Sequence, residues 1–264
     1  MRKRHSRDLT PKRPRALAAG GTIGIIAPAG PIEQREPLYQ SIATLERFGF
    51  RVRYEERIFD SVRYLAGDDA TRAAELTRYF GDPGIQAIIP LRGGYGCARL
   101  IPLLDEKRLR RHCKILMGFS DLTTLHLFFL RRFGWITLHG PMAMSAALAE
   151  IGPDAAKHLL ALLTDADYRP HFSFPQLETW YPGVAEGKIV GGCLSLVASS
   201  LGTAYEIETE GSILFLEDLG EAPYRIDRML TQLRLAGKLD SVAGVLLGGF
   251  HDCNPTEGNY TAAE

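Results

Sequence analysis

The chain has 264 residues, 45% hydrophobic and 23% charged, which is an ordinary globular composition with enough apolar material for one large domain or two smaller ones. Its 31 lysines and arginines balance 31 aspartates and glutamates, so no net charge attracts it to nucleic acid or an anionic membrane. No apolar run reaches the roughly 18 residues of a membrane-spanning helix. A peptide or small molecule is therefore the expected partner, with neither nucleic acid nor membrane.

The first 19 residues predict a basic, flexible tail. Seven basic residues stand beside the single acid Asp8 there: Arg2, Lys3, Arg4, Arg7, Lys12, Arg13 and Arg15. A secretory signal is the alternative, because an apolar stretch follows and ends in the A-x-A-like Ala27-Pro28-Ala29. Glycines interrupt that stretch, and its β-branched residues favour a buried strand.

Residues 20–164 predict a doubly wound, Rossmann-like α/β domain. Short apolar runs alternate there with segments of helical period, as in parallel strands joined by crossover helices. The predicted strands are Thr22–Ala27, Arg51–Tyr54, Ala87–Leu91 and Lys114–Gly118, and the predicted helices are Ile32–Phe48 and Asp69–Phe80.

A second, smaller and β-rich domain is expected over residues 187–264. A proline-containing stretch at 165–186 predicts the linker before it. The strands expected in and before this domain are Val184–Val190, Ser212–Leu216 and Val242–Leu247, and the helices are Leu194–Ser199 and Pro223–Gly237. The last helix carries Ile226, Met229, Leu230 and Leu233 on one face.

No metal or cofactor is expected. The four cysteines, Cys97, Cys113, Cys193 and Cys253, form no C-x-x-C pair, so they predict buried thiols in a reducing compartment. No Walker lysine is present, and the glycines at 20, 21 and 24 precede their strand, unlike those of a dinucleotide-binding fingerprint.

The first candidate site is the turn Gly118-Phe119-Ser120-Asp121, which follows an apolar strand and opens a helix. A serine there has the setting of a nucleophile elbow, although Leu122 replaces the final glycine of G-x-S-x-G. The alternative is that Ser120 caps the N-terminus of the helix.

The second candidate site is the loop Arg92-Gly93-Gly94-Tyr95-Gly96, directly after another strand. Its glycines let backbone N–H groups approach a ligand, either an oxyanion or a phosphate. Arg92 is a candidate to grip a substrate carboxylate.

The third candidate site is the pair Glu217-Asp218 near the end of a predicted strand. A carboxylate there could orient a catalytic histidine. The alternative is a solvated acidic turn, or acids in the first turn of the following helix. Arg225, further along, is a second candidate for substrate binding.

Five segments together resemble the LD-carboxypeptidase family, in its order and at similar spacing. They are residues 21–31, Arg92–Gly96, Gly118–Asp121, Leu138–Met142 and Phe215–Asp218. The resemblance implies that Ser120 is the nucleophile, that Glu217 is the acidic triad member, and that backbone amides of the Gly93-Gly94 turn and of Asp121 form the oxyanion hole.

The resemblance also implies a substrate and a setting. The family's members are serine carboxypeptidases that need no metal and release a terminal D-amino acid from an L-configured centre of muropeptides, during peptidoglycan recycling in the cytoplasm. They are commonly homodimers with an active site between the two domains. Within the same fold, a microcin-immunity-type hydrolase of peptide–nucleotide conjugates is the alternative. A module that binds an anion without catalysis is the alternative from another class.

One feature departs from the family, whose triad histidine comes late in a glycine-flanked motif that this chain lacks. His251 stands too early for that motif, although it could supply the base from a rearranged position. His139 is expected to pack or to form a hydrogen bond, and four other histidines are expected to be solvated or structural: His112, His126, His158 and His171.

The chain ends on Thr261-Ala262-Ala263-Glu264, which has the form of a capping box at a helix start. A helix that starts there and stops after one turn would gain almost no packing. We therefore expect the C-terminal domain to be incomplete, and the chain to lack a competent triad.

Overall fold

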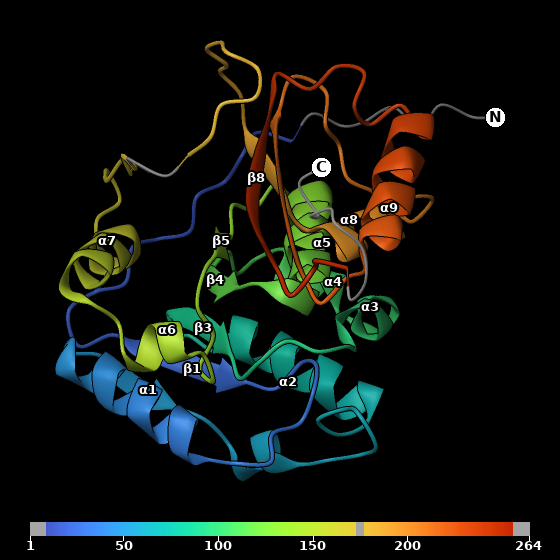
Figure 1. Ribbon diagram of the computed structural model, residues 1–264. Coiled ribbons are helices and arrows are strands. Elements are labelled where there is room, and N and C mark those ends of the chain that lie inside the picture. The colour runs from blue at the N-terminus through green and yellow to red at the C-terminus, as the bar shows by residue number, and fades with distance from the viewer. Residues whose placement is uncertain (1–8, 173–176, 256–264) are drawn as a thin grey trace.

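The computed structural model describes residues 9–172 and 177–255, which form two parallel sheets with helices packed on them (Figure 1). The first sheet has five strands in the order β2-β1-β3-β4-β5, and the second has three in the order β6-β7-β8. The predicted α/β class, with a smaller second sheet in the C-terminal part, is confirmed.

The first sheet contains the four predicted strands in the predicted order and a fifth, at Leu138–His139, that was not predicted. Its strands are β1 (Thr22–Ile26), β2 (Arg51–Arg53), β3 (Ala87–Pro90), β4 (Ile115–Gly118) and β5 (Leu138–His139). The helices are α1 (Glu36–Arg47), α2 (Asp69–Gly81), α3 (Cys97–Leu100), α4 (Glu106–Leu109), α5 (Thr123–Phe133), α6 (Ala146–Ala149) and α7 (Pro153–Thr164). Single 3₁₀ turns lie at Glu56–Phe59, Ile101–Leu103 and Ser120–Leu122.

Helix α1 begins four residues later than predicted, at Glu36 instead of Ile32. Pro37 explains the difference, because proline has no N–H and its ring clashes with the carbonyl four residues earlier inside a helix. Proline is accommodated in the first turn, which is where Pro37 lies.

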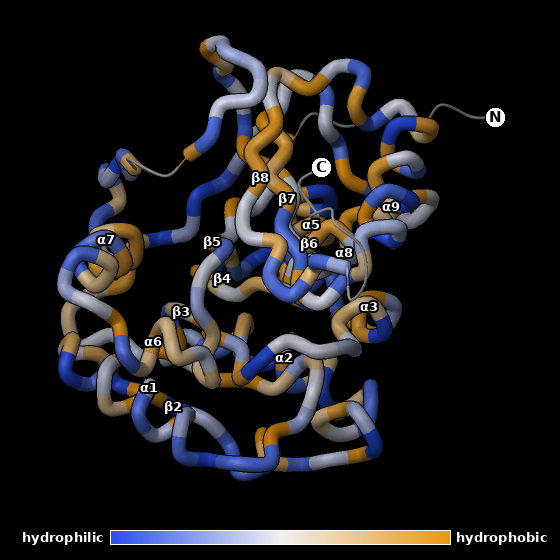
Figure 2. The backbone as a smooth tube through the Cα atoms, in the orientation of Figure 1, coloured by the Kyte–Doolittle hydropathy of each residue, from blue (hydrophilic) through white to orange (hydrophobic). Residues whose placement is uncertain are grey.

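Helices cover both faces of the first sheet, as in a doubly wound fold. On one face Ile26, Ile88 and Leu116 pack against helices α2 to α5. On the other face Ile23, Ile25 and Ile89 pack against α1, α6 and α7. Figure 2 shows the hydrophobic residues gathered along the strands of both sheets.

The second sheet consists of β6 (Ile189–Cys193), β7 (Ile213–Leu219) and β8 (Gly244–His251), with α8 (Leu194–Ser199) and α9 (Pro223–Leu235). The strand predicted at Val184–Val190 is wrong in position. Its ladder with β7 starts at Ile189 opposite Ile213, where β7 itself begins, and the Lys188 carbonyl just before it accepts a 2.9 Å hydrogen bond from the Ile213 N–H.

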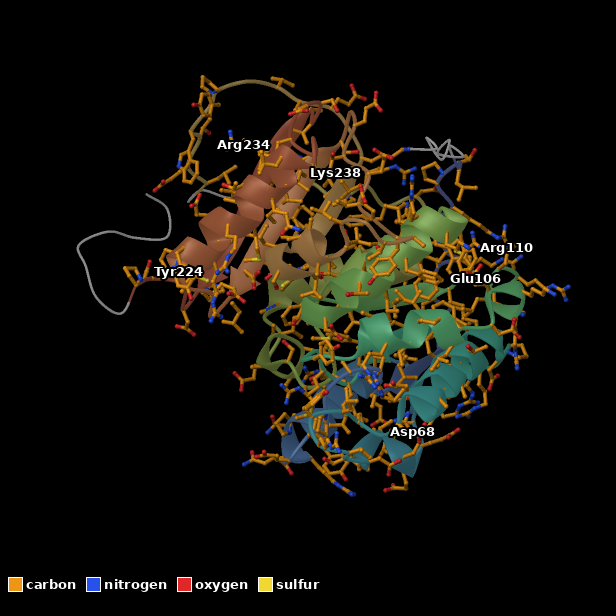
Figure 3. The ribbon with its side chains drawn as sticks, turned by 90° about the vertical axis from the view of Figure 1, so that its right-hand side faces the viewer. Asp68, Glu106, Arg110, Tyr224, Arg234 and Lys238 are labelled. Atoms are coloured by element: carbon orange, nitrogen blue, oxygen red, sulfur yellow. The ribbon has the colours of Figure 1, made fainter. Side chains whose placement is uncertain are left out.

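Two strands of the second sheet run further than predicted. Strand β7 continues through Glu217 and Asp218, and β8 continues to His251. Helix α9 packs as predicted, with Ile226 and Leu233 buried and Met229 and Leu230 partly buried in the same core. Its other side is exposed, as Figure 3 shows for Tyr224 and Arg234.

Helix α5 joins the two parts. Leu125 and Phe129 belong to the core of the first sheet, whereas Leu127 belongs to the core of the second. At the start of α5, the Thr123 hydroxyl accepts a hydrogen bond of 3.1 Å from the backbone N–H of Cys193, the last residue of β6. The carboxyl end of the second sheet is thereby attached to the turn that precedes α5.

The longest helices of the described residues, α2 and α9, have 13 residues each, fewer than the about 20 that would cross a bilayer. Three of the four cysteines are buried, and Cys113 is partly buried.

Candidate active site

The turn after β4 holds Ser120 in a strained conformation. Phe119 is extended, and Ser120 has φ +60° at the start of the 3₁₀ turn that leads into α5. A positive φ is uncommon for a residue with a side chain and costs on the order of 1–3 kcal/mol. The N-cap of the 3₁₀ turn is Phe119 and that of α5 is Leu122, so Ser120 caps neither. The helix-cap interpretation is therefore wrong, and the geometry is that of a nucleophile elbow.

The glycine loop lies directly against this serine. A Cβ atom built on Gly93 would stand 3.0 Å from both Cβ and Oγ of Ser120, and 3.4 Å from the backbone nitrogen of Asp121. Only a residue without a side chain leaves room for this approach. The structure thus brings two segments together that the sequence identified separately.

The orientation of the glycine loop is also determined. The Gly93 carbonyl accepts a 3.1 Å hydrogen bond from the Gly30 backbone N–H, in the loop after β1. Since the C=O and N–H of a trans peptide point in opposite directions, this bond also sets the direction of the Gly94 N–H. Gly94 has φ +115°, a conformation that other residues rarely adopt.

Glu217 lies within β7, next to strand β6, whose last residue Cys193 is hydrogen-bonded to Thr123 after the nucleophile turn. Glu217 is itself in register with Cys193. Its Oε1 atom is buried and has no hydrogen-bond partner among the described residues. Burial, together with the neighbouring Asp218 charge, raises the pKa of Glu217 to about 7. A half-buried carboxyl with one oxygen buried and without a donor is a candidate partner for a group that the described structure does not contain.

Asp218 has a different role, because neighbouring strand residues point to opposite faces. Its side chain is buried and accepts hydrogen bonds of 2.8 Å from the Ser195 N–H at the start of α8 and from the Leu219 N–H. The Cys193 thiol donates a third, at 3.4 Å. The interpretation of the acid pair as a solvated turn is therefore wrong for both residues.

Two histidines contact the site, and both are held by their surroundings. The ring of His139 packs between Phe119 and Phe215, with centroids 6.1 and 5.1 Å away, which confirms the expected packing role. The buried His126 hydrogen-bonds the Gly118 carbonyl through Nε2 at 2.8 Å, a structural role. Burial lowers the pKa of His126 to about 4, so its ring is neutral at physiological pH.

His251 ends β8 and is exposed. Its ring folds back over its own strand, so that a Cβ built on Gly249 would lie 2.4 Å from Nε2. Within residues 9–172 and 177–255 no hydrogen bond joins this ring to Ser120 or Glu217. The predicted capping box at Thr261–Glu264 lies outside the described residues.

The two candidate arginines lie in different places. Arg92 is exposed beside the glycine loop, where it donates to the Pro31 carbonyl at 3.3 Å. Arg225 is exposed on α9, where it contacts the Tyr224 hydroxyl at 3.2 Å and Glu221 at 3.6 Å. Only Arg92 is joined to the loops around Ser120 by a contact that the structure shows.

Three side chains around the site were not singled out from the sequence: Arg72, the Asp121 carboxylate and His126. Arg72 and Asp121 are almost fully buried charged groups, and His126 is a buried imidazole. Helical positions such as 72 and 126 carry no signal of a nearby site. For Asp121, its position directly after Ser120 was the one feature of the sequence that could have indicated a role in the site.

A strained serine with a glycine-rich loop packed against it, on a parallel α/β sheet, defines the class of the site as that of a serine hydrolase. Family comparison agrees with this class. The LD-carboxypeptidase N-terminal domain matches residues 23–140, and the LD-carboxypeptidase C-terminal domain matches residues 186–264. The chain belongs to the LD-carboxypeptidase family.

Two relatives with names in this family support this membership. A probable murein peptide carboxypeptidase of Bacillus subtilis is 39% identical over 93% of this chain and 77% of its own length. A murein tetrapeptide carboxypeptidase of Pseudomonas aeruginosa is 34% identical over 92% of this chain and 84% of its own.

Two solved structures have the same fold. A muramoyltetrapeptide carboxypeptidase from Oxalobacter formigenes has a TM-score of 0.77 at 30% identity, covering 89% of this chain and 78% of its own. The microcin self-immunity protein MccF, in complex with aspartyl sulfamoyl adenosine, has a TM-score of 0.83 at 24% identity, covering 94% of this chain and 84% of its own.

Proposed function

We propose that this protein is a serine carboxypeptidase that releases the terminal D-amino acid from a muropeptide stem, at an amide whose other side is an L-configured centre. The observation that carries the proposal is the contact between the strained Ser120 and Gly93. A glycine loop this close to the Ser120 hydroxyl supports an oxyanion hole made of its backbone amides, and acyl transfer requires such a hole beside a nucleophile. The relatives named as murein peptide carboxypeptidases support the choice of substrate.

In this mechanism the Ser120 hydroxyl attacks the scissile carbonyl and forms a tetrahedral intermediate. The amides of the Gly93-Gly94 turn and of Asp121 donate hydrogen bonds to the oxyanion. They do so without rearrangement, because the glycine loop is already held in place before the reaction. Glu217 orients and stabilises an imidazolium, and Arg92 binds the free carboxylate of the substrate. We assign no triad histidine among the described residues.

The intermediate then collapses: the scissile C–N bond breaks, the D-amino acid leaves as an amine that has taken up the proton lost by Ser120, and an acyl ester remains on Ser120. Water adds to this ester, the C–O bond to Ser120 breaks, the shortened peptide leaves as a carboxylate, and Ser120 recovers a proton from the water. We propose that the protein acts in the cytoplasm as a homodimer, as the family resemblance implies. Light scattering coupled to size exclusion tests the dimer.

The primary test is release of D-alanine from a muramoyl tetrapeptide by the purified full-length protein. Ser120→Ala should abolish release and labelling by a serine-directed fluorophosphonate. Ser145→Ala is the matched control, because Ser145 stands before α6 and its side chain makes no capping bond. Full activity of Ser120→Ala would remove Ser120 from the mechanism.

The same reagents separate the alternatives. An anion-binding module without catalysis predicts no labelling of Ser120 in the parent. Faster turnover of a peptidyl nucleotide than of the tetrapeptide would favour a microcin-immunity activity. The MccF likeness alone, at 24% identity, supports the shared fold. If His251 is the base, His251→Ala should lose turnover as completely as Ser120→Ala.

A further inference from the structure

The side chain of Asp121 connects the nucleophile turn to the far end of the glycine loop. It is 1% exposed, and its Oδ2 accepts a 2.8 Å hydrogen bond from the backbone N–H of Cys97. Cys97 is the first residue of α3 and directly follows Gly96. The residue next to Ser120 therefore holds the point at which the glycine loop ends.

The glycine loop needs such an anchor. Gly94 and Gly96 have φ +115° and +139°, and glycine has the greatest backbone freedom of all residues. A loop of this composition is not rigid by itself. Its amides can stabilise an oxyanion efficiently only if the surrounding structure holds them in place before the reaction.

Contacts at both ends supply that restraint. At the near end, the Gly30 N–H binds the Gly93 carbonyl. At the far end, the fully buried Arg72 binds the carbonyls of Pro28 and Gly67, and its guanidinium leaves no space for a side chain on Gly96. Among these contacts, the Asp121 carboxylate is the one that comes from the nucleophile turn itself.

We propose that the Asp121 carboxylate is a positioning residue, which aligns the glycine-loop amides with Ser120 by holding the Cys97 N–H. This role deepens the proposed function and rests on it. It differs from the role of the Asp121 backbone amide, which any residue at this position could supply. Loss of the carboxylate should therefore impair the chemical step and leave substrate binding nearly unchanged.

Three substitutions separate positioning from general stability. Asp121→Ala removes the acceptor, whereas Asp121→Asn keeps a carbonyl oxygen in the same place. Burial raises the pKa of the Asp121 carboxyl, and a neutral amide reproduces the accepting oxygen in either protonation state. Asp105→Ala is the matched control, because exposed Asp105 also accepts from a backbone N–H, that of Arg108 at 3.0 Å, at the start of helix α4, and within the described residues makes no hydrogen bond to the glycine loop or to Ser120.

Two measurements do not depend on the substrate. Amide hydrogen exchange over residues 93–97, followed by mass spectrometry, should accelerate at least about tenfold in Asp121→Ala, since a lost buried hydrogen bond opens the loop. Fluorophosphonate labelling of Ser120 should slow by about 10- to 100-fold. Asp121→Asn and Asp105→Ala should resemble the parent in both.

On the tetrapeptide, Asp121→Ala should lower kcat by about 10- to 100-fold and change KM by less than about threefold. Parent-like exchange and labelling in a folded Asp121→Ala protein would overturn the proposal, as would an Asp121→Asn variant as impaired as the alanine variant. If Asp121→Ala does not fold, Asp121→Leu replaces it, because leucine fills a similar volume without an acceptor oxygen. If the variants show this pattern of exchange and labelling but the parent releases no D-alanine, the proposed substrate is refuted, whereas the positioning role of the Asp121 carboxylate stands.

Discussion

Gly93→Ala tests the closest contact in the site. The added methyl group would stand 3.0 Å from both Cβ and Oγ of Ser120, whereas ordinary van der Waals contact begins at 3.4 Å. Gly93 does not have a positive φ, so alanine is compatible with its backbone conformation. The perturbation is therefore almost entirely a displacement of the serine from the glycine loop.

The size of the effect follows from that displacement. Relieving the overlap requires a shift of at least about 0.4 Å, comparable to the whole range of 2.7–3.1 Å over which an amide donates well to an oxyanion. Losing one such donor costs about 10²–10³ in kcat, so a partial loss should lower kcat by about 10- to 100-fold. Crowding of a packed site should cost about 1 kcal/mol of folding free energy.

The assay compares D-alanine release, fluorophosphonate labelling and urea denaturation for Gly93→Ala and Gly152→Ala. Gly152 is the control because its φ is −71° and a Cβ there has no atom within 4 Å. That variant should keep full turnover, with stability unchanged or slightly raised through the unfolded state. A Gly93→Ala protein with parental kcat and labelling would refute the placement of the loop against Ser120.

Three further outcomes are expected. Glu217→Gln should lower turnover. Because the pKa of Glu217 is raised to about 7, the parent loses stability as the pH rises from about 4.5 to 7, and the variant does not. The stability of the variant relative to the parent should therefore be higher at pH 8 than at pH 4 by up to about 2 kcal/mol, and equal pH dependence of unfolding in both proteins would contradict this. Because the pKa of His126 is lowered to about 4, the free energy of unfolding of the parent should fall by about 2–3 kcal/mol more than that of His126→Gln as the pH falls from 6.5 to 4. Denaturation at each pH measures this difference, and equal falls in both proteins would disprove the lowered pKa. Gly191→Ala should lower the free energy of unfolding by at least about 3 kcal/mol, since its φ is +130° and a Cβ would lie 1.9 Å from the Phe215 carbonyl oxygen. The control Gly202→Ala, with φ +78° and open space around the Cβ, should lower it by only about 1 kcal/mol. Similar urea midpoints for the two variants would argue against the close packing at Gly191.

Local sequence pattern determined most of the elements. The β-branched run at Thr22–Ile26 became β1, and the helix Leu194–Ser199 has the predicted ends. These features depend on neighbours in the chain, through alternation, helical period and the freedom of glycine. The motifs around Gly93, Ser120 and Glu217 were recognisable for the same reason, because each is a short segment of distinctive residues.

Where local pattern was insufficient, the deciding partner was remote. The start of β6 was misplaced because its pairing depends on where β7 begins. Composition alone could not separate Glu217 from Asp218, since they are adjacent acids. The structure shows that Asp218 meets the N-terminus of α8, whereas Glu217 Oε1 is left without a donor.

The site itself was decided by tertiary structure. Whether Ser120 caps a helix or faces a ligand depends on a positive φ that packing maintains. Two contacts join segments that follow neighbouring strands: that between Ser120 and Gly93, and the hydrogen bond from Cys97 to Asp121. Sequence periodicity does not predict how far apart these segments lie in space. The sequence determined which chemical groups were present. Their distances came from the docking of strands, helices and the second sheet, because that geometry is set by many small packing free energies summed over the whole core.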